Sequence, residues 1–305
     1  MDYTQIISAV IALISALVSA FLIPWIKTKI DADKLQTLRT YVEIGVKAAE
    51  QLYTATDGAA KKAYVVNFLA ENISPKTKLL IMNIPNNPTG YIPVRTELDR
   101  ILNLADRMGT WVFNEETYRG MEHDPAAALP SLADIYPRAT VIGGLNKYGL
   151  PGTRMGWLAS KNRQLIEECA GYKDYTTYCN NAPGEILATI AMRNAPDLLQ
   201  RNHKIVLENL GMAEAFFKKH RDLFQWIQPN GGSTAFPRLL PPYDVTEMCE
   251  RAMTEKKLLI IGERAFGLDT NHFRVGLGRL DFSKALAVFS DIADEIQAKR
   301  AEAAN

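Results

Sequence analysis

Residues 143–157 read GGLNKYGLPGTRMGW, a glycine-rich stretch that carries Lys147 and Arg154. The residues TVIGG at 140–144 are rich in β-branched side chains and end in glycine, which predicts a strand that runs into a loop. A lysine at the end of a buried strand loses its proton easily, and the free amine is a nucleophile toward carbonyl groups. Arg154 adds a planar, permanent charge that suits a phosphate. The alternative is a surface loop with two solvated cations, and this stretch alone leaves both interpretations open.

The segments upstream of this loop predict an α/β fold. KLLIM at 78–82 and WVF at 111–113 indicate short buried strands. Between them lie the turn-rich NIPNNPTG at 83–90 and an amphipathic helix at 94–108. Strand, helix, strand, loop and strand at this spacing predict a largely parallel sheet.

Polar residues follow the ends of these strands. Polar side chains just past the carboxyl ends of parallel strands line the ligand crevice of such sheets. We therefore expect Asn87, Glu115, Tyr118 and Lys147 to converge there.

These motifs resemble the class I/II, fold-type I aminotransferases, which use pyridoxal 5′-phosphate (PLP). The resemblance rests on PNNPTG, a carboxylate-x-Tyr-Arg-Gly segment, and GGLxK followed by YGLPGxRxGW. Three later segments support it: YTTYCNNAPGEILATIAM at 175–192, PNGGSTAFPRL at 229–239 and HFRVGLGR at 272–279. It covers residues 74–298. It implies a PLP-transferase-like fold with a partly parallel sheet and a small α+β C-terminal domain, acting on amino acids and 2-oxo acids, with a homodimer possible.

The resemblance implies a role for each site residue. Lys147 is implied to form the Schiff base with PLP and to carry the proton afterwards. Asn87 and Tyr118 are implied to donate to the 3′-oxygen of the cofactor, and Arg154 to bind its phosphate. Arg274 is implied to bind the α-carboxylate of the substrate. The alternatives without a functional role are an Asx turn at Asn87, a core tyrosine at Tyr118 and a surface ion pair at Arg274. His272 and Arg279 are expected to be structural.

Three departures from the family pattern predict weakened activity. Glu115 stands where the family has the aspartate that pairs with the pyridine nitrogen, so the carboxylate is one methylene longer. Lys147 directly precedes Tyr148, whereas the family usually has one residue between them. The family's long region before PNNPTG, with its first strands, phosphate loop and stacking aromatic ring, has no counterpart in residues 1–72. A sheet without those strands is expected to expose an edge and apolar faces.

Composition excludes some other classes. The chain has 305 residues with 35 basic and 34 acidic side chains, so the balance gives no indication of a nucleic-acid partner. Its three cysteines, at positions 169, 179 and 249, are odd in number and far apart. That pattern fits reduced thiols and predicts neither a disulfide framework nor a metal site.

The N-terminal stretch is a different kind of sequence. Residues 6–26 carry no charge and are long enough to cross a bilayer as one helix. Trp25 suits a membrane interface, and the lysines at 27 and 29 place the C-terminal side in the cytoplasm by the positive-inside rule. The alternative is a buried core helix, and the absence of a basic n-region argues against a signal peptide.

Two short amphipathic helices are expected between residues 31 and 72. Together with the span, the pieces FLIPWIK, VKAAEQLY and KKAYVVNFLAE resemble the small phage holins of the LLH type. The predicted organisation is therefore a holin-like segment at 1–72, a partial PLP-binding large domain at 73–195 and a small domain at 196–305. A second functional hypothesis follows, namely a membrane-lesion protein whose aminotransferase-derived part is inactive.

Overall fold

The computed structural model describes residues 76–303, with side chains up to residue 298. The described residues belong to one compact unit of the chain. The predicted span at 6–26 and the helices at 31–72 lie outside the described residues. Within residues 76–303, none of the helices combines the length and apolar character that a membrane crossing requires.

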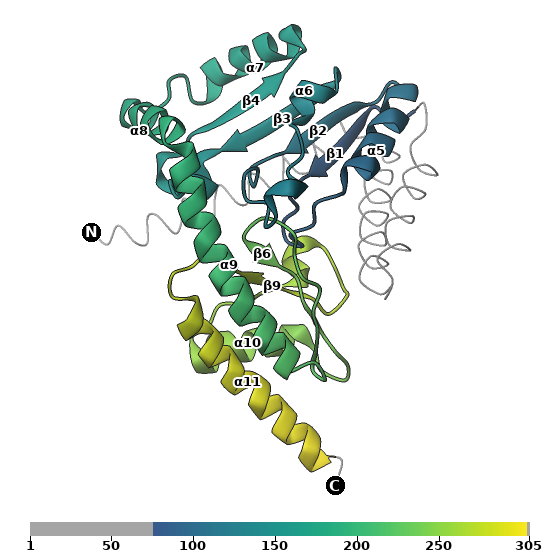
Figure 1. Cartoon of the computed structure of the whole chain (residues 1–305), viewed down its shortest axis with the longest axis vertical. Helices are drawn as coiled ribbons and strands as arrows, with labels where there is room; N and C mark the ends of the chain where they lie inside the picture. The colour runs from purple at the N-terminus through teal and green to yellow at the C-terminus, as the bar shows by residue number, and fades with distance from the viewer. Residues whose placement is uncertain (1–75, 304–305) are drawn as a thin grey trace, which may run out of the picture. The chain divides into compact units, whose positions relative to one another are not determined.

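A four-stranded mixed sheet forms the first half of the described chain, in the order β1-β2-β3-β4 (Figure 1). Strands β1, β2 and β3 run parallel, and β4 pairs antiparallel with β3. The strands are β1 (Leu79–Asn83), β2 (Trp111–Glu115), β3 (Ala139–Gly144) and β4 (Gly156–Ser160). The first three match the predicted strands to within two residues, and the strand order and parallel pairing confirm the α/β expectation.

One face of this sheet carries an apolar core. Helix α5 (Arg95–Arg107) buries Leu98, Leu102 and Ala105 against Val112 and Val141, which are sheet residues. The i, i+4, i+7 spacing of the helix residues places them on one face of the helix. The short helix α6 (Leu132–Ile135) closes the same core.

The sheet leaves apolar side chains exposed elsewhere. Ile81 of β1 is 71% exposed, and Trp157 of β4 is 42% exposed. Helix α7 (Arg163–Thr176), which follows β4, buries none of its residues. In the described part of the chain, β1 and β4 each pair with one strand only, so both are edges. Within residues 76–303, the sheet therefore has the exposed edges and apolar side chains that were expected.

Helices α8 (Ala182–Arg193) and α9 (Ala195–Lys219) follow α7. The resemblance implies a helical segment over 175–192, but in the structure residues 177–181 separate the end of α7 from the start of α8. Asn181 caps the new helix by accepting a hydrogen bond from the Gly184 N–H at 2.6 Å. Pro183 lies in the first turn of α8, where its missing N–H costs nothing, so a capped start replaces a continuous helix.

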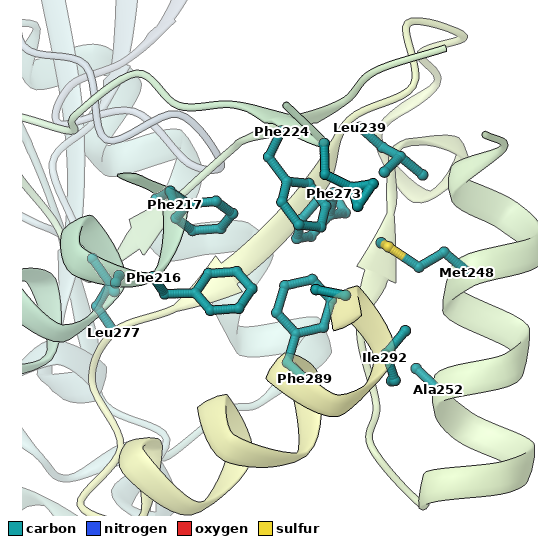
Figure 2. Packing of buried hydrophobic residues seen from close by; sticks show 14 of the residues in the cluster. Phe216, Phe217, Phe224, Leu239, Met248, Ala252, Phe273, Leu277, Phe289 and Ile292 are labelled. Carbon is teal, nitrogen blue, oxygen red and sulfur yellow. The ribbon is translucent and has the colours of Figure 1, made fainter. Parts of the chain in front are cut away.

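The C-terminal part is an α+β unit packed around aromatic side chains. Phe217, Phe224, Phe273 and Phe289 make ring contacts there, with the Phe217–Phe224 and Phe273–Phe289 centroids each 5.5 Å apart (Figure 2). The long helix α9 begins beside the sheet and carries Phe217 into this core (Figure 1).

The remaining elements of the C-terminal part surround the same core. Its strands form a two-stranded sheet, β5-β7, and a three-stranded sheet, β6-β9-β8. These elements are β5 (Phe224–Gln225), β6 (Thr234–Ala235), β7 (Arg238–Leu239), α10 (Val245–Lys256), β8 (Ile261–Gly262), β9 (Phe273–Gly276) and α11 (Phe282–Ala303).

Candidate active site

Lys147 lies directly after β3, in the short 3-10 turn Leu145–Tyr148. Its Nζ lies over the ring of Tyr118, 4.3 Å from the ring centroid. Tyr118 is buried at 3% exposure and follows the carboxyl end of β2. The lysine amine is therefore held against an aromatic face at the carboxyl end of two parallel strands, as the crevice rule predicts.

The absence of a residue between Lys147 and Tyr148 is accommodated by the turn. Gly149 ends the turn with φ of 90°, a conformation in which a side chain would be strained. The carbonyl oxygen of Lys147 accepts a hydrogen bond from Asn202 Nδ2 of α9 at 2.8 Å. Helix α9 thus ties down the backbone of the lysine turn while the lysine side chain faces Tyr118.

Asn87 and Arg274 meet across the two halves of the described chain. Arg274 of β9 donates from Nη1 to Asn87 Oδ1 at 3.3 Å. Its guanidinium carbon also lies 5.6 Å from the centroid of the Phe266 ring. Because the amide oxygen of Asn87 is engaged, its Nδ2 donor is the group left to face a ligand.

Glu115 ends β2 and accepts a hydrogen bond from Asn83 Nδ2 at 3.0 Å. The next residue, Glu116, is buried on the opposite side of the strand, where its Oε1 accepts from the Leu132 N–H at 2.9 Å. Successive strand residues point to opposite faces. Glu115 is therefore the carboxylate beside the Asn87 loop, and Glu116 caps the start of α6.

Arg154 occupies a different environment from the other predicted site residues. It is exposed and left-handed, with φ of 55°, and its Nη1 donates to the Pro151 carbonyl oxygen at 3.3 Å. Asn181 donates to the neighbouring Thr153 carbonyl oxygen at 3.1 Å, which holds this loop against the start of α8. The structure thus connects Lys147 with Tyr118 and Asn87 with Arg274, whereas the contacts described for Arg154 stay within its own loop.

Two other residues of the HFRVGLGR segment have structural environments. His272 is 2% exposed and stacks on Phe236 with the ring centroids 5.1 Å apart. Burial, and then the charge of Arg238, lower the pKa of His272 to about 4. Arg279 forms an exposed ion pair with Asp281 at 3.2 Å. Neither residue joins the site.

Sequence reasoning missed the asparagines that hold this site. Asn83 lies in a turn-rich run and carries no motif of its own, so only the strand register reveals its link to Glu115. Asn202 is 55 positions from the lysine that it supports, and no sequence signal connects the two.

A lysine after a parallel strand, a carboxylate at the end of the neighbouring strand and an asparagine in NPTG lie where the resemblance to the fold-type I aminotransferases implies them. Solved structures agree with this fold. A PLP-dependent aminotransferase from Streptococcus suis superposes with a TM-score of 0.70 at 27% identity, covering 75% of this chain and 61% of that one.

The family model for aminotransferase class I and II matches residues 33–282, so the chain belongs to this family. Members of the family use PLP. The match begins at residue 33, inside the segment that was expected to be holin-like and 41 residues before the start of the motif-based resemblance at 74.

The chain also matches only part of the length of its curated relatives. Capreomycidine synthase of Streptomyces vinaceus is 30% identical over 230 residues, covering 72% of this chain and 56% of the relative. Aspartate aminotransferase of Thermotoga maritima is 23% identical over 248 residues, covering 76% and 62%. The chain therefore spans roughly three-fifths of the length of the relatives it matches.

Proposed function

We propose that the chain binds PLP and transfers an amino group between an amino acid and a 2-oxo acid, with Lys147 and Tyr118 as its catalytic residues. The observation that carries the proposal is the position of the Lys147 amine, 4.3 Å from the Tyr118 ring centroid at the carboxyl end of the parallel strands. Family membership supports the same reaction class.

The residues present fit PLP by the chemistry of their donor groups. The Lys147 amine suits an aldehyde, and the Asn87 amide and Tyr118 hydroxyl suit an oxygen acceptor on the ring. The Glu115 carboxylate suits a protonated ring nitrogen, and the Arg154 guanidinium suits a phosphate. Bound PLP supplies an electron sink that stabilises negative charge at the carbon next to the substrate amine.

The protein's own groups then bind, orient and move a proton. With PLP bound, Lys147 Nζ would take the proton from the substrate Cα and pass it to C4′ of the cofactor. The Tyr118 ring face packs against this amine, with Nζ 4.3 Å from the ring centroid, and so keeps it close to the strand ends. The hydrogen bond from Asn202 to the Lys147 carbonyl fixes the turn that carries the amine, and precise placement matters because about 1 Å of displacement costs on the order of 10²-fold in rate.

Arg274 is proposed to bind the α-carboxylate of the substrate. Its guanidinium has a planar fork that matches two carboxylate oxygens. Its contact with Asn87 supports this role, because Arg274 would then hold the substrate carboxylate beside the NPTG loop that is proposed to bind the ring oxygen of the cofactor.

A homodimer is also proposed, because class I and II aminotransferases commonly form homodimers. Helix α8 exposes Ile186 at 63% and Ile190 at 52%, one helical turn apart on the same face. Sedimentation of the wild type and of Ile186→Asp tests this proposal, with Leu280→Asp as the control because Leu280 is equally apolar and 78% exposed on another segment. Weaker self-association in Ile186→Asp but not in Leu280→Asp supports a dimer interface at this face of α8. Self-association of Ile186→Asp equal to that of wild type contradicts such an interface.

Residues 6–26 are proposed to anchor the chain in a membrane, on the strength of their uncharged 21-residue sequence. The holin-like lesion hypothesis rests on the same segment. Extraction of membranes at alkaline pH distinguishes an anchored chain from a peripheral one, and dye leakage from cells expressing residues 1–72 tests lesion formation. Full release at alkaline pH contradicts the anchor.

The experiment that tests the enzyme proposal uses the full chain with PLP, a panel of amino acids and a 2-oxo acid acceptor. Mass spectrometry of both products detects amino transfer, with Lys147→Ala and Arg274→Lys as variants. We expect transfer to disappear in Lys147→Ala and the KM for the amino acid to rise at least about tenfold in Arg274→Lys. Equal turnover by wild type and Lys147→Ala contradicts the proposal.

One alternative outcome has support among the relatives. The first curated relative named above is a synthase, and a PLP-dependent cyclase is 25% identical with a TM-score of 0.68. The same assay separates the two outcomes. If wild type but not Lys147→Ala consumes an amino acid and the 2-oxo acid acceptor stays unchanged, a PLP-dependent rearrangement or cyclisation of that amino acid is favoured over amino transfer.

A further inference from the structure

The side chain of Asn83 uses both ends of its amide within the candidate site. Its Nδ2 donates to Glu115 Oε2 at 3.0 Å and to the Glu115 carbonyl oxygen at 3.3 Å. Its Oδ1 accepts from the Asn87 N–H at 2.6 Å. One side chain therefore contacts the two residues that are proposed to hold the pyridine nitrogen and the ring oxygen of PLP.

The sheet explains why this residue can reach both. Asn83 and Glu115 are Cα partners in the parallel register of β1 and β2, and each is the last residue of its strand. The chain then turns back, so that the backbone N–H of Asn87 faces the side chain four residues earlier. A donor and an acceptor on one planar amide fix the strand end and the loop in a single geometry.

The carboxylate of Glu115 benefits most from such support. It is one methylene longer than the aspartate of the family pattern, so it has one more rotatable bond to immobilise. A hydrogen bond to a charged acceptor is stronger than one between neutral groups. Glu115 is half-buried, and within residues 76–298 the one hydrogen bond to its carboxylate comes from Asn83 Nδ2.

We propose that Asn83 is a positioning residue of the PLP site, which orients the Glu115 carboxylate and holds the Asn87 loop at the same time. This inference rests on the proposed function. This role differs from that of a simple Asx turn, which uses only the Oδ1 of Asn83 and does not require a hydrogen bond from its Nδ2.

Two substitutions in the full chain separate the two ends of the amide. Asn83→Ala removes both contacts. Asn83→Asp keeps an oxygen for the Asn87 N–H, loses the donor to Glu115 and places a second carboxylate beside it. The matched control is Asn162→Ala, which removes a side-chain hydrogen bond to the Leu165 N–H at the start of α7, away from the site.

The first readout is the dissociation constant for PLP from an absorbance titration. We expect Asn83→Ala and Asn83→Asp each to weaken binding at least about tenfold, as for a lost hydrogen bond to a charged group. Asn162→Ala should stay within about twofold of wild type. Crossing Asn83→Ala with Glu115→Ala should give less than the product of the two single effects, because the residues act through one contact. If the loss of PLP affinity in the double variant equals the product of the two single losses, Asn83 and Glu115 act independently and the coupling is refuted.

The second readout needs no cofactor. Hydrogen exchange of the peptide that contains Asn87 should quicken in Asn83→Ala and remain as in wild type in Asn83→Asp and Asn162→Ala. The same cycle of Asn83→Ala and Glu115→Ala, measured by thermal unfolding without PLP, should also be non-additive. If wild type shows no Lys147-dependent binding of PLP, the proposed function fails, yet these two measurements still decide the positioning. Unchanged exchange in Asn83→Ala overturns it.

Discussion

The buried His272 predicts a specific loss of stability in acid. It is 2% exposed, stacks on Phe236, and its Nδ1 lies 2.7 Å from Thr270 Oγ1. Burial and the nearby charge of Arg238 lower its pKa from 6.5 to about 4. The folded state therefore keeps this imidazole neutral under conditions in which the unfolded chain protonates it.

The sign follows from proton linkage. Between pH 6.5 and pH 4 the unfolded chain binds more protons than the folded chain, so the free energy of unfolding falls as the pH falls. A difference of about 2.5 pKa units at 1.36 kcal/mol per unit amounts to about 3 kcal/mol once the pH is below 4. Burial also lowers the pKa of His220, so the wild-type loss includes a second contribution of the same sign.

Comparison with His272→Gln isolates the contribution of His272. Urea unfolding of the full chain at several pH values, followed by near-UV circular dichroism, gives the free energy of unfolding for both proteins. At pH 7 the two differ by a constant packing cost. Between pH 7 and pH 4 we expect wild type to lose about 3 kcal/mol more than the variant. Parallel pH profiles for the two proteins would refute the reasoning.

Three further predictions concern other parts of the chain. Gly143→Ala places a Cβ 2.6 Å from the Trp157 ring, so we expect a lower melting temperature and a shift in tryptophan fluorescence, and an unchanged melting temperature contradicts the close packing of β3 on β4. Asp244 caps α10 through the Thr246 and Glu247 N–H groups, so Asp244→Ala should cost about 1 kcal/mol in chemical denaturation at pH 7, whereas Asp244→Asn should cost much less. The hydrogen bond from the Glu247 N–H is the main cause of a lowered pKa for Asp244, so the capping contribution is present at neutral pH and disappears as the pH falls through that lowered pKa. Equal losses in both variants argue against the cap. Burial raises the pKa of Cys249 to about 11, so this thiol should react with iodoacetamide more slowly than the exposed Cys179 at pH 8, as peptide mass mapping can check.

The sequence predicted those helices and strands in which a run of apolar residues begins and ends clearly. The strands at 78–82 and 111–113 and the helix at 94–108 agree with β1, β2 and α5 to within two residues, because turn residues or glycine bound each of them. Strand β4 was not predicted, because its residues are mostly exposed and buried and exposed positions do not alternate along it. The break at 177–181 was also missed, because it depends on a local cap in which Asn181 Oδ1 accepts from the Gly184 N–H.

The candidate site was predictable as a set of residue types and not as a geometry. Motif order identified Lys147 and Glu115, but only the pleat of β2 shows that Glu115 and Glu116 face opposite sides. The support from Asn83 depends on the register of two strands, and that from Asn202 on the path of a helix far along the chain. Such long-range contacts have no local signal in one sequence.

The central claim is that Lys147 is the amine that holds PLP. The most direct test is an absorbance spectrum of the full chain mixed with PLP, beside Lys147→Ala under the same conditions. The account predicts a band near the edge of the visible range that is present in wild type, absent in Lys147→Ala and altered by added amino acids. A folded wild-type protein whose spectrum with PLP equals that of Lys147→Ala would contradict it.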